Sequence, residues 1–69
     1  MNKKDFEYEV KEIKETIGYF GVFVGDDEMV IATDYKIISK PSYEELYLYM
    51  NGQLIAKAKL GDVIGGDYV

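Results

Sequence analysis

The sequence predicts an α+β fold in which an N-terminal helix packs on an antiparallel sheet of four or five strands. Three observations support it: an apolar stripe at helical spacing near the N-terminus, short runs of β-branched and aromatic residues, and an Asn-Gly pair between two alternating segments. The alternative is an all-β small barrel, which follows if residues 6–10 form a strand. Residues 1–69 are expected to form a single small domain.

The predicted helix extends from Asn2 to Gly18. Its apolar residues recur after four, three and four positions, which is the spacing of one helix face: Phe6, Val10, Ile13 and Ile17. Asn2 or Asp5 is expected to cap the start, and Gly18 is expected to end the helix. Phe6, Tyr8 and Val10 also alternate with charged residues, as in a strand. The longer periodic pattern favours the helix.

Two strands are predicted at residues 19–24 and 29–33, joined by the polar turn Gly25-Asp26-Asp27-Glu28. A third strand, at residues 35–39, ends before Pro41, because proline lacks the backbone N–H that a sheet ladder needs. The tail, residues 61–69, contains three glycines and two aspartates and is predicted to be a loop or a short edge strand.

A hairpin is predicted across residues 44–59, with its turn at Asn51-Gly52. A three-residue loop from Met50 to Gly52 puts Gly52 in a left-handed bulge position. It gives the following pairs: Leu48 with Leu54, Leu46 with Ala56, Tyr47 with Ile55, and Glu45 with Lys57. A two-residue loop pairs Tyr49 with Leu54 and Leu48 with Ile55, which mixes polar and apolar residues on both faces. We therefore expect the three-residue loop.

In this register the two faces of the hairpin differ in character. The inward face is aliphatic: Leu46, Leu48, Leu54, Ala56 and Ala58. The outward face is aromatic and charged: Tyr43, Glu45, Tyr47, Tyr49, Ile55, Lys57 and Lys59. A helix over the same segment ranks second. Ser42 would cap that helix, and its stripe would comprise Tyr43, Leu46, Tyr47 and Met50.

The composition limits the chemistry of the chain. It contains seven tyrosines but no histidine, cysteine, tryptophan or arginine. A side chain that titrates unaided near neutral pH, a thiolate nucleophile and a planar fork for phosphate are therefore all missing. Paired carboxylates remain an acid–base option, but no pattern brings two of them into one pocket. We expect no enzymatic activity and no cofactor.

The carboxylates of Asp26, Asp27 and Glu28 are adjacent in the predicted turn. Oxygen ligands suit Mg²⁺ or Ca²⁺, but the residue spacing of a calcium-binding loop is absent. The preferred interpretation is a solvated turn that contributes to an acidic surface. No metal site is expected.

The formal net charge is -5, from 13 acidic residues and 8 basic residues that are all lysine. Direct binding of nucleic acid is not expected, because it needs a basic footprint. Apolar runs are too short for a membrane span, and no apolar signal segment follows the N-terminal residues, so the expected location is the cytoplasm. A composition rich in Lys, Tyr and Ile is typical of an AT-rich gene, such as one from a phage or mobile element.

The outward face of the hairpin is the predicted partner-binding site. Tyrosine offers a large contact area at low entropic cost and is enriched at interface cores. The residues are Tyr43, Tyr47, Tyr49 and Ile55, with Lys57 and Lys59 at the edge. In the alternative interpretation, the N-terminal helix covers these rings and they belong to the core.

These features predict a non-enzymatic protein-binding module, specifically a small acidic inhibitor that blocks a basic functional surface of a larger protein, such as one that binds nucleic acid. Its carboxylates would imitate phosphate charge: Glu7, Glu9, Glu12, Glu15, Asp26, Asp27 and Glu28. A domain this small has a small core and no disulfide, so self-association is also expected.

The second hypothesis is a homo-oligomer that sequesters a small, nucleotide-like ligand between subunits. Tyrosines would stack on a base, while Lys57, Lys59 and the backbone amides of residues 61–66 would hold phosphate. The absence of arginine counts against it. A subunit with only a structural role is the third alternative.

Overall fold

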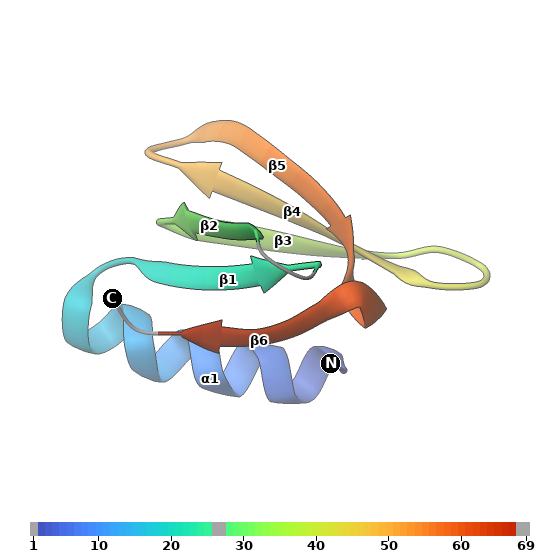
Figure 1. Cartoon of the computed structure of the whole chain (residues 1–69), viewed down its shortest axis with the longest axis horizontal. Helices are drawn as coiled ribbons and strands as arrows, with labels where there is room; N and C mark the ends of the chain where they lie inside the picture. The colour runs from blue at the N-terminus through green and yellow to red at the C-terminus, as the bar shows by residue number, and fades with distance from the viewer. Residues whose placement is uncertain (1, 26–27, 68–69) are drawn as a thin grey trace.

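The structure, a computed structural model, describes residues 2–25 and 28–67, and these form one α-helix, one 3₁₀ helix and six strands. The elements are α1 Lys3–Ile17, β1 Phe20–Val24, β2 Glu28–Ala32, β3 Asp34–Ser39, β4 Glu44–Met50, β5 Gln53–Lys59, η1 Leu60–Asp62 and β6 Val63–Asp67. The helix lies beside β1 and β6, and the β4–β5 hairpin lies at the far side of the molecule (Figure 1). The predicted α+β class is confirmed.

The helix α1 begins and ends as predicted. The side chain of Asn2 accepts a hydrogen bond from the backbone N–H of Asp5 at 2.8 Å. Gly18 has φ of 96° and donates its N–H to the carbonyl oxygen of Lys14 at 2.7 Å. The asparagine satisfies a free N–H of the first turn, and glycine adopts the left-handed conformation without strain. Since residues 6–10 are helical, the condition for the all-β alternative is not met.

The strands form two antiparallel sheets with the orders β2-β1-β6 and β3-β4-β5. The chain passes from the first sheet to the second through Thr33, which lies between β2 and β3. Thr33 donates its backbone N–H to the carbonyl oxygen of Tyr49 at 2.8 Å, and its hydroxyl accepts the N–H of Asn51 at 2.8 Å. Thr33 therefore ties the corner between the sheets to the β4–β5 turn. The strand β6 lies at a sheet edge, as predicted for part of the tail.

The core fills the space between α1 and the inner faces of the sheets. Its buried residues come from every layer: Phe6, Val10, Ile13, Phe20, Val22, Ala32, Leu46, Leu48, Leu60 and Val63. The ring of Tyr35 on β3 meets the ring of Phe6 edge-on, with the centroids 5.2 Å apart, and meets Phe20 at 6.2 Å. These contacts join the helix, β1 and β3 through one side chain.

The β4–β5 hairpin forms, but its predicted register is wrong. The turn has two residues, Asn51 with φ of 50° and Gly52 with φ of 86°, as in the tight turns that match the twist of paired strands. The observed pairs are Tyr49 with Leu54, Leu48 with Ala56, Leu46 with Ala58, Tyr47 with Lys57, and Glu45 with Lys59. Ile55 is therefore an extra residue in β5, so the bulge lies within the strand and not in the turn. The helix alternative for this segment is also wrong.

Most of the predicted face assignment survives this error, because a two-residue shift returns each side chain to its original side of the sheet. Leu46 and Leu48 are fully buried, and Ala56 packs against the core. Leu54 is the exception. It was predicted to point inward, but it pairs with Tyr49 beyond the bulge and is 42% exposed.

Candidate binding face

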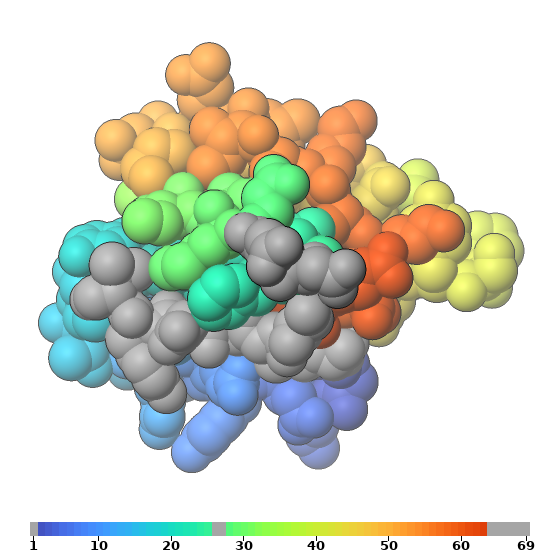
Figure 2. Space-filling model, in the orientation of Figure 1, coloured from blue at the N-terminus to red at the C-terminus, as the bar shows by residue number. Residues whose placement is uncertain are grey.

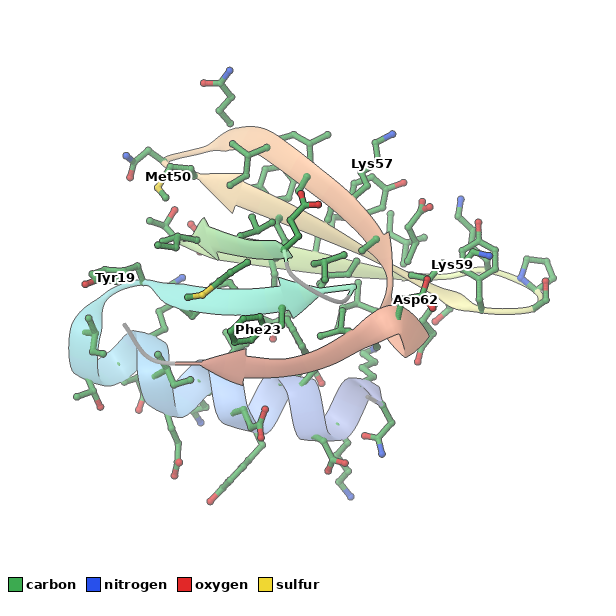
Figure 3. The ribbon with its side chains drawn as sticks, viewed as in Figure 1. Tyr19, Phe23, Met50, Lys57, Lys59 and Asp62 are labelled. Carbon is green, nitrogen blue, oxygen red and sulfur yellow. The ribbon has the colours of Figure 1, made fainter. Side chains whose placement is uncertain are left out.

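The outer surface of β3, β4 and β5 lies on the opposite side of this sheet from the core. Because side chains alternate along a strand, the burial of Leu46 and Leu48 turns Tyr47 and Tyr49 outward. The same alternation in β3 places Lys36 outside. We call the following set the tyrosine face: Lys36, Tyr43, Glu45, Tyr47, Tyr49, Leu54, Ile55, Lys57 and Lys59. Lys57 points away from α1 (Figure 3).

The six predicted partner-binding residues all belong to the tyrosine face. The helix α1 packs against the core on the other side of this sheet, where Phe6 contacts Tyr35. The helix therefore does not cover the tyrosines. In the space-filling view, the blue helix and the orange strand β5 lie at opposite ends of the molecule (Figure 2).

Two lysines lie over two of the tyrosine rings. Lys57 Nζ is 5.6 Å from the ring centroid of Tyr47, its cross-strand partner. Lys59 Nζ is 5.2 Å from the ring centroid of Tyr43, which precedes β4. Both distances fall within the range of a cation–π interaction, which contributes about 0.5–1 kcal/mol at an exposed site. These contacts place the two ammonium groups over the rings, while both lysines remain exposed to solvent.

The phenol of Tyr47 donates a hydrogen bond to Glu45 Oε1 at 2.6 Å. This hydrogen bond to a carboxylate favours the neutral phenol and, with smaller contributions from burial and nearby charges, raises the pKa of Tyr47 above its ordinary value of 10.0. Glu45 also lies directly opposite Lys59 in the neighbouring strand. The one carboxylate of the tyrosine face therefore accepts a hydrogen bond from a tyrosine of the same face, and it forms no ion pair with Lys59.

The bulge in β5 adds apolar surface to the tyrosine face. Leu54 pairs with the outward Tyr49, and Ile55 is the unpaired extra residue. The two consecutive side chains are 42% and 44% exposed, and Tyr43 is 39% exposed. Exposed apolar side chains that gather on one face mark interaction sites more often than scattered ones do.

Sequence reasoning missed Lys36 and Leu54. Lys36 is the cross-strand partner of Tyr47 in β3, so Tyr47 has a lysine on either side. The alternation of Tyr35 and Ile37 with Lys36 could have placed this lysine outside, but only strand pairing shows which tyrosine it flanks. Leu54 was missed because the bulge that reverses its direction has no clear sequence signal.

The predicted acidic surface is only partly described. Asp26 and Asp27 lie outside the described residues, and Glu28 is exposed at the start of β2. The carboxylates of α1 are exposed along the helix, away from the tyrosine face. Among the described residues, no cluster of three or more carboxylates could hold a metal ion.

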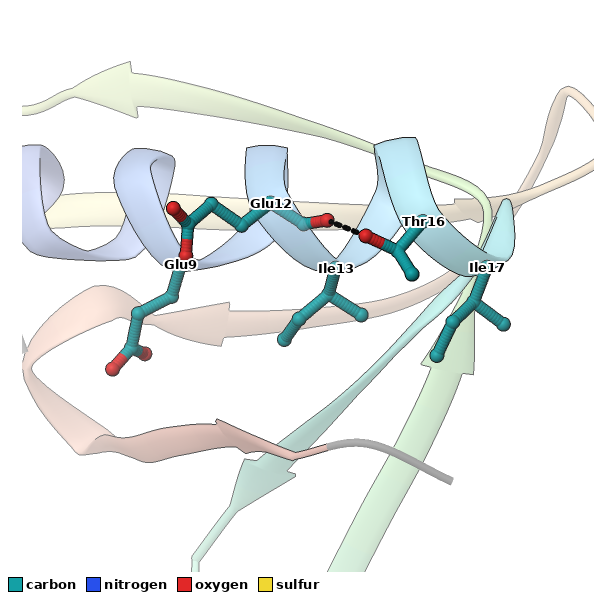
Figure 4. Close-up of a pocket in the computed structure, with 5 residues that line it drawn as sticks. All are labelled: Glu9, Glu12, Ile13, Thr16 and Ile17. Carbon is teal, nitrogen blue, oxygen red and sulfur yellow. Dashed lines mark hydrogen bonds between the residues drawn. The ribbon is translucent and has the colours of Figure 1, made fainter.

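A pocket of about 250 Å³ lies along α1, lined by Glu9, Glu12, Ile13, Thr16 and Ile17 (Figure 4). The hydroxyl of Thr16 is turned back onto its own helix, where it donates to the carbonyl oxygen of Glu12 at 2.9 Å. The apolar floor comes from the two isoleucines, and the two glutamates make the rim acidic. Such a rim repels phosphate and carboxylate ligands.

No helix in the part of the chain that the structure describes has the length and apolar character needed to cross a bilayer. No protein-family model matches the sequence, and neither the curated proteins nor the solved structures contain a match to the chain.

Proposed function

We propose that this chain is a non-enzymatic protein-binding module that inhibits a larger protein by covering one of its functional surfaces with the tyrosine face. The observation that supports it is the grouping of three tyrosines, Leu54 and Ile55 on the outer side of a hydrogen-bonded sheet. Tyr43, Leu54 and Ile55 are exposed there, and Tyr47 and Tyr49 are half-buried. We further propose that the protein acts in the cytoplasm and derives from a phage or mobile-element gene.

The tyrosine face suits a protein surface better than a small molecule. It is built on three paired strands, so its backbone is already ordered before binding, and tyrosine side chains lose little conformational entropy when they are buried. The described pocket lies on α1 and is not part of this face. An array of rings with a charged edge resembles the apolar core and polar rim of protein interfaces.

A basic partner surface would be met by a different part of the molecule. The exposed carboxylates of α1, including Glu9 and Glu12 at the pocket, would approach it, and the net charge of -5 would speed the encounter. This form of the hypothesis predicts docking through α1, whereas the aromatic anchors predict docking through the tyrosine face. We favour the tyrosine face because buried aromatic contacts contribute more to affinity than exposed charges do.

Sequestration of a nucleotide-like ligand has less support. Gly65 and Gly66 pair with Phe23 and Val22 in the β1–β6 ladder, so this stretch is a strand and not a loop that cradles phosphate. The pocket on α1 has an acidic rim. Lys57 and Lys59 are exposed on the tyrosine face and do not line this pocket, so they cannot hold the phosphate of a ligand bound there.

The test begins with a photoreactive phenylalanine analogue at position 49, and at position 8 as the control. Tyr8 is 66% exposed on α1 and has the same ring chemistry. We expect a specific protein crosslink in cells that carry the gene from position 49 and not from position 8. The crosslinked protein is then purified, and its binding to unmodified chain is measured by calorimetry.

In that binding assay, Tyr47→Ala is compared with Tyr8→Ala. A buried aromatic anchor contributes about 2 kcal/mol, so Tyr47→Ala should weaken binding about thirty-fold, whereas Tyr8→Ala should leave it unchanged. The opposite pattern, with binding lost in Tyr8→Ala and retained in Tyr47→Ala, would contradict docking through the tyrosine face and favour docking through α1.

A further inference from the structure

The charge of the tyrosine face is opposite in sign to that of the whole chain. The face holds three of the eight lysines, Lys36, Lys57 and Lys59, but only one of the 13 acidic residues, Glu45. The remaining acidic residues therefore outnumber the remaining lysines by 12 to 5. Asp34 lies on the same side of β3 as Lys36, opposite Tyr49 at the edge of the face, but its charge is paired with that of Lys14 of α1. The face is a locally basic surface on an acidic protein.

The lysines of this face lack carboxylate partners. Among residues 2–25 and 28–67, the one ion pair joins Lys14 and Asp34. Lys57 and Lys59 instead lie over tyrosine rings. These are weak contacts that an incoming carboxylate can add to without removing an existing ion pair. Charges on the far side of the molecule act weakly here, because the Debye length is about 8 Å at physiological salt and the shortest dimension of the molecule is 22 Å.

The strand β5 supplies a direction for the incoming chain. It lies at the edge of its sheet, with β4 as its neighbour. Beyond the bulge, residues 56–59 continue as a regular strand in which Lys57 and Lys59 project from the same side. Residues two positions apart in a strand are separated by about 6.6 Å, and an extended peptide laid alongside has the same repeat. Acidic residues at alternate positions of that peptide would therefore meet successive lysines.

We propose that the tyrosine face recognises an extended acidic segment of its partner, which lies along β5 with carboxylates at alternate positions beside Lys57 and Lys59. This inference rests on the proposed protein-binding function and specifies the chemistry of the partner. Main-chain hydrogen bonds to the edge strand supply affinity, as in other cases of strand addition, and the lysines select the acidic side chains. Leu54 and Ile55 offer apolar contact at the other end of the strand.

A single-stranded nucleic acid is the other polyanion with a regular repeat. The structure favours the peptide for two reasons. Lysines already cover the rings of Tyr43 and Tyr47, on which bases would have to stack. The chain also has no arginine, and a net charge of -5 opposes the approach of a polyphosphate.

The experiment is an NMR titration of the isotopically labelled full chain with three probes: a short peptide of alternating Glu and Thr, a matched peptide of alternating Lys and Thr, and oligothymidylate. We expect the Glu peptide to shift the amide signals of residues 56–59 and of Tyr47, the cross-strand partner of Lys57, and high salt to weaken the effect. The absence of these shifts would overturn the inference, as would stronger binding of the Lys peptide or of oligothymidylate at the same residues.

Charge-removing variants give a second readout. The double substitution Lys57→Gln and Lys59→Gln should weaken binding of the Glu peptide about five-fold, since each exposed ion pair contributes about 0.5 kcal/mol. The matched control, Lys3→Gln with Lys4→Gln on α1, should leave it unchanged. Equal weakening by both pairs would overturn the inference, because it would mean a general charge effect. A purified partner whose affinity depends on Tyr47 but not on Lys57 and Lys59 would also overturn it and leave the proposed function standing.

Discussion

Truncation of Leu48 should destabilise the fold far more than truncation of its neighbour Tyr47. Leu48 is fully buried between the sheets, whereas Tyr47 lies on the outer side of the same strand. Leu48→Ala removes three carbon-sized groups from the core, which costs about 2.4 kcal/mol by transfer alone, and the cavity left behind brings the total to about 2–5 kcal/mol. A domain of this length has a total stability of about 3–10 kcal/mol, so the variant would lose a large part of it.

Tyr47→Ala removes a cation–π contact with Lys57 and a hydrogen bond to Glu45, both at the surface. The cation–π contact contributes about 0.5–1 kcal/mol. Loss of the hydrogen bond leaves the Glu45 carboxylate free to bind water, so no buried polar group is left without a partner. Urea denaturation of both variants, with fits that keep the slope free, measures the two costs. If Tyr47→Ala lowers the free energy of unfolding more than Leu48→Ala does, then the inner and outer faces have been assigned to the wrong sides, and the binding proposal fails with them.

Three further predictions concern the turn, the response to pH and assembly. Gly52→Ala should lower the free energy of unfolding by about 1 kcal/mol, because Gly52 has φ of 86°; an unchanged denaturation midpoint would contradict the turn described here. Burial, with a smaller contribution from Glu7, raises the pKa of Tyr35, and the pKa of Tyr47 is raised too. Folding therefore favours the neutral phenols, so the free energy of unfolding should stay constant below about pH 10 and decrease above it. Denaturation at a series of pH values measures this decrease, which should be smaller in Tyr35→Phe. The protein should sediment as a dimer or larger at micromolar concentration; a monomer that stays folded at high temperature would refute the expectation that self-association completes its burial.

The sequence predicted the elements of this fold because their signals are local. Phe6, Val10 and Ile13 gave the buried stripe of α1, and Asn2 and Gly18 gave its ends. The Asn51-Gly52 pair located the hairpin turn. The two-sheet arrangement was not predicted. The chain passes from one sheet to the other at Thr33, and this corner is held by hydrogen bonds to Tyr49 and Asn51, which lie far along the sequence.

The composition of the candidate face followed from side-chain alternation, so it tolerated an error in register. The bulge at Ile55 could not be foreseen. A two-residue turn with a bulge inside β5 and a three-residue turn with its bulge at Gly52 place most side chains on the same faces. The choice between them decides the direction of Leu54 and the tyrosine that each lysine faces. Those details depend on the cross-strand pairs and not on the residues of one strand.

The pairing of β1 with β6 has a consequence for the order of folding. The hairpin β4–β5 closes across two residues, whereas β1 meets β6 only after most of the chain has been made, as Val24 does with Val63. Closing a long loop costs more entropy than closing a tight turn, so local pairs form early and distant pairs late. The sheet that carries the tyrosines can therefore assemble before β6 docks. Until β6 pairs with β1, the backbone N–H and C=O groups along that edge of β1 have no strand partner. An unpaired strand edge favours pairing with a wrong strand, so this stage of folding carries the greatest risk of misfolding.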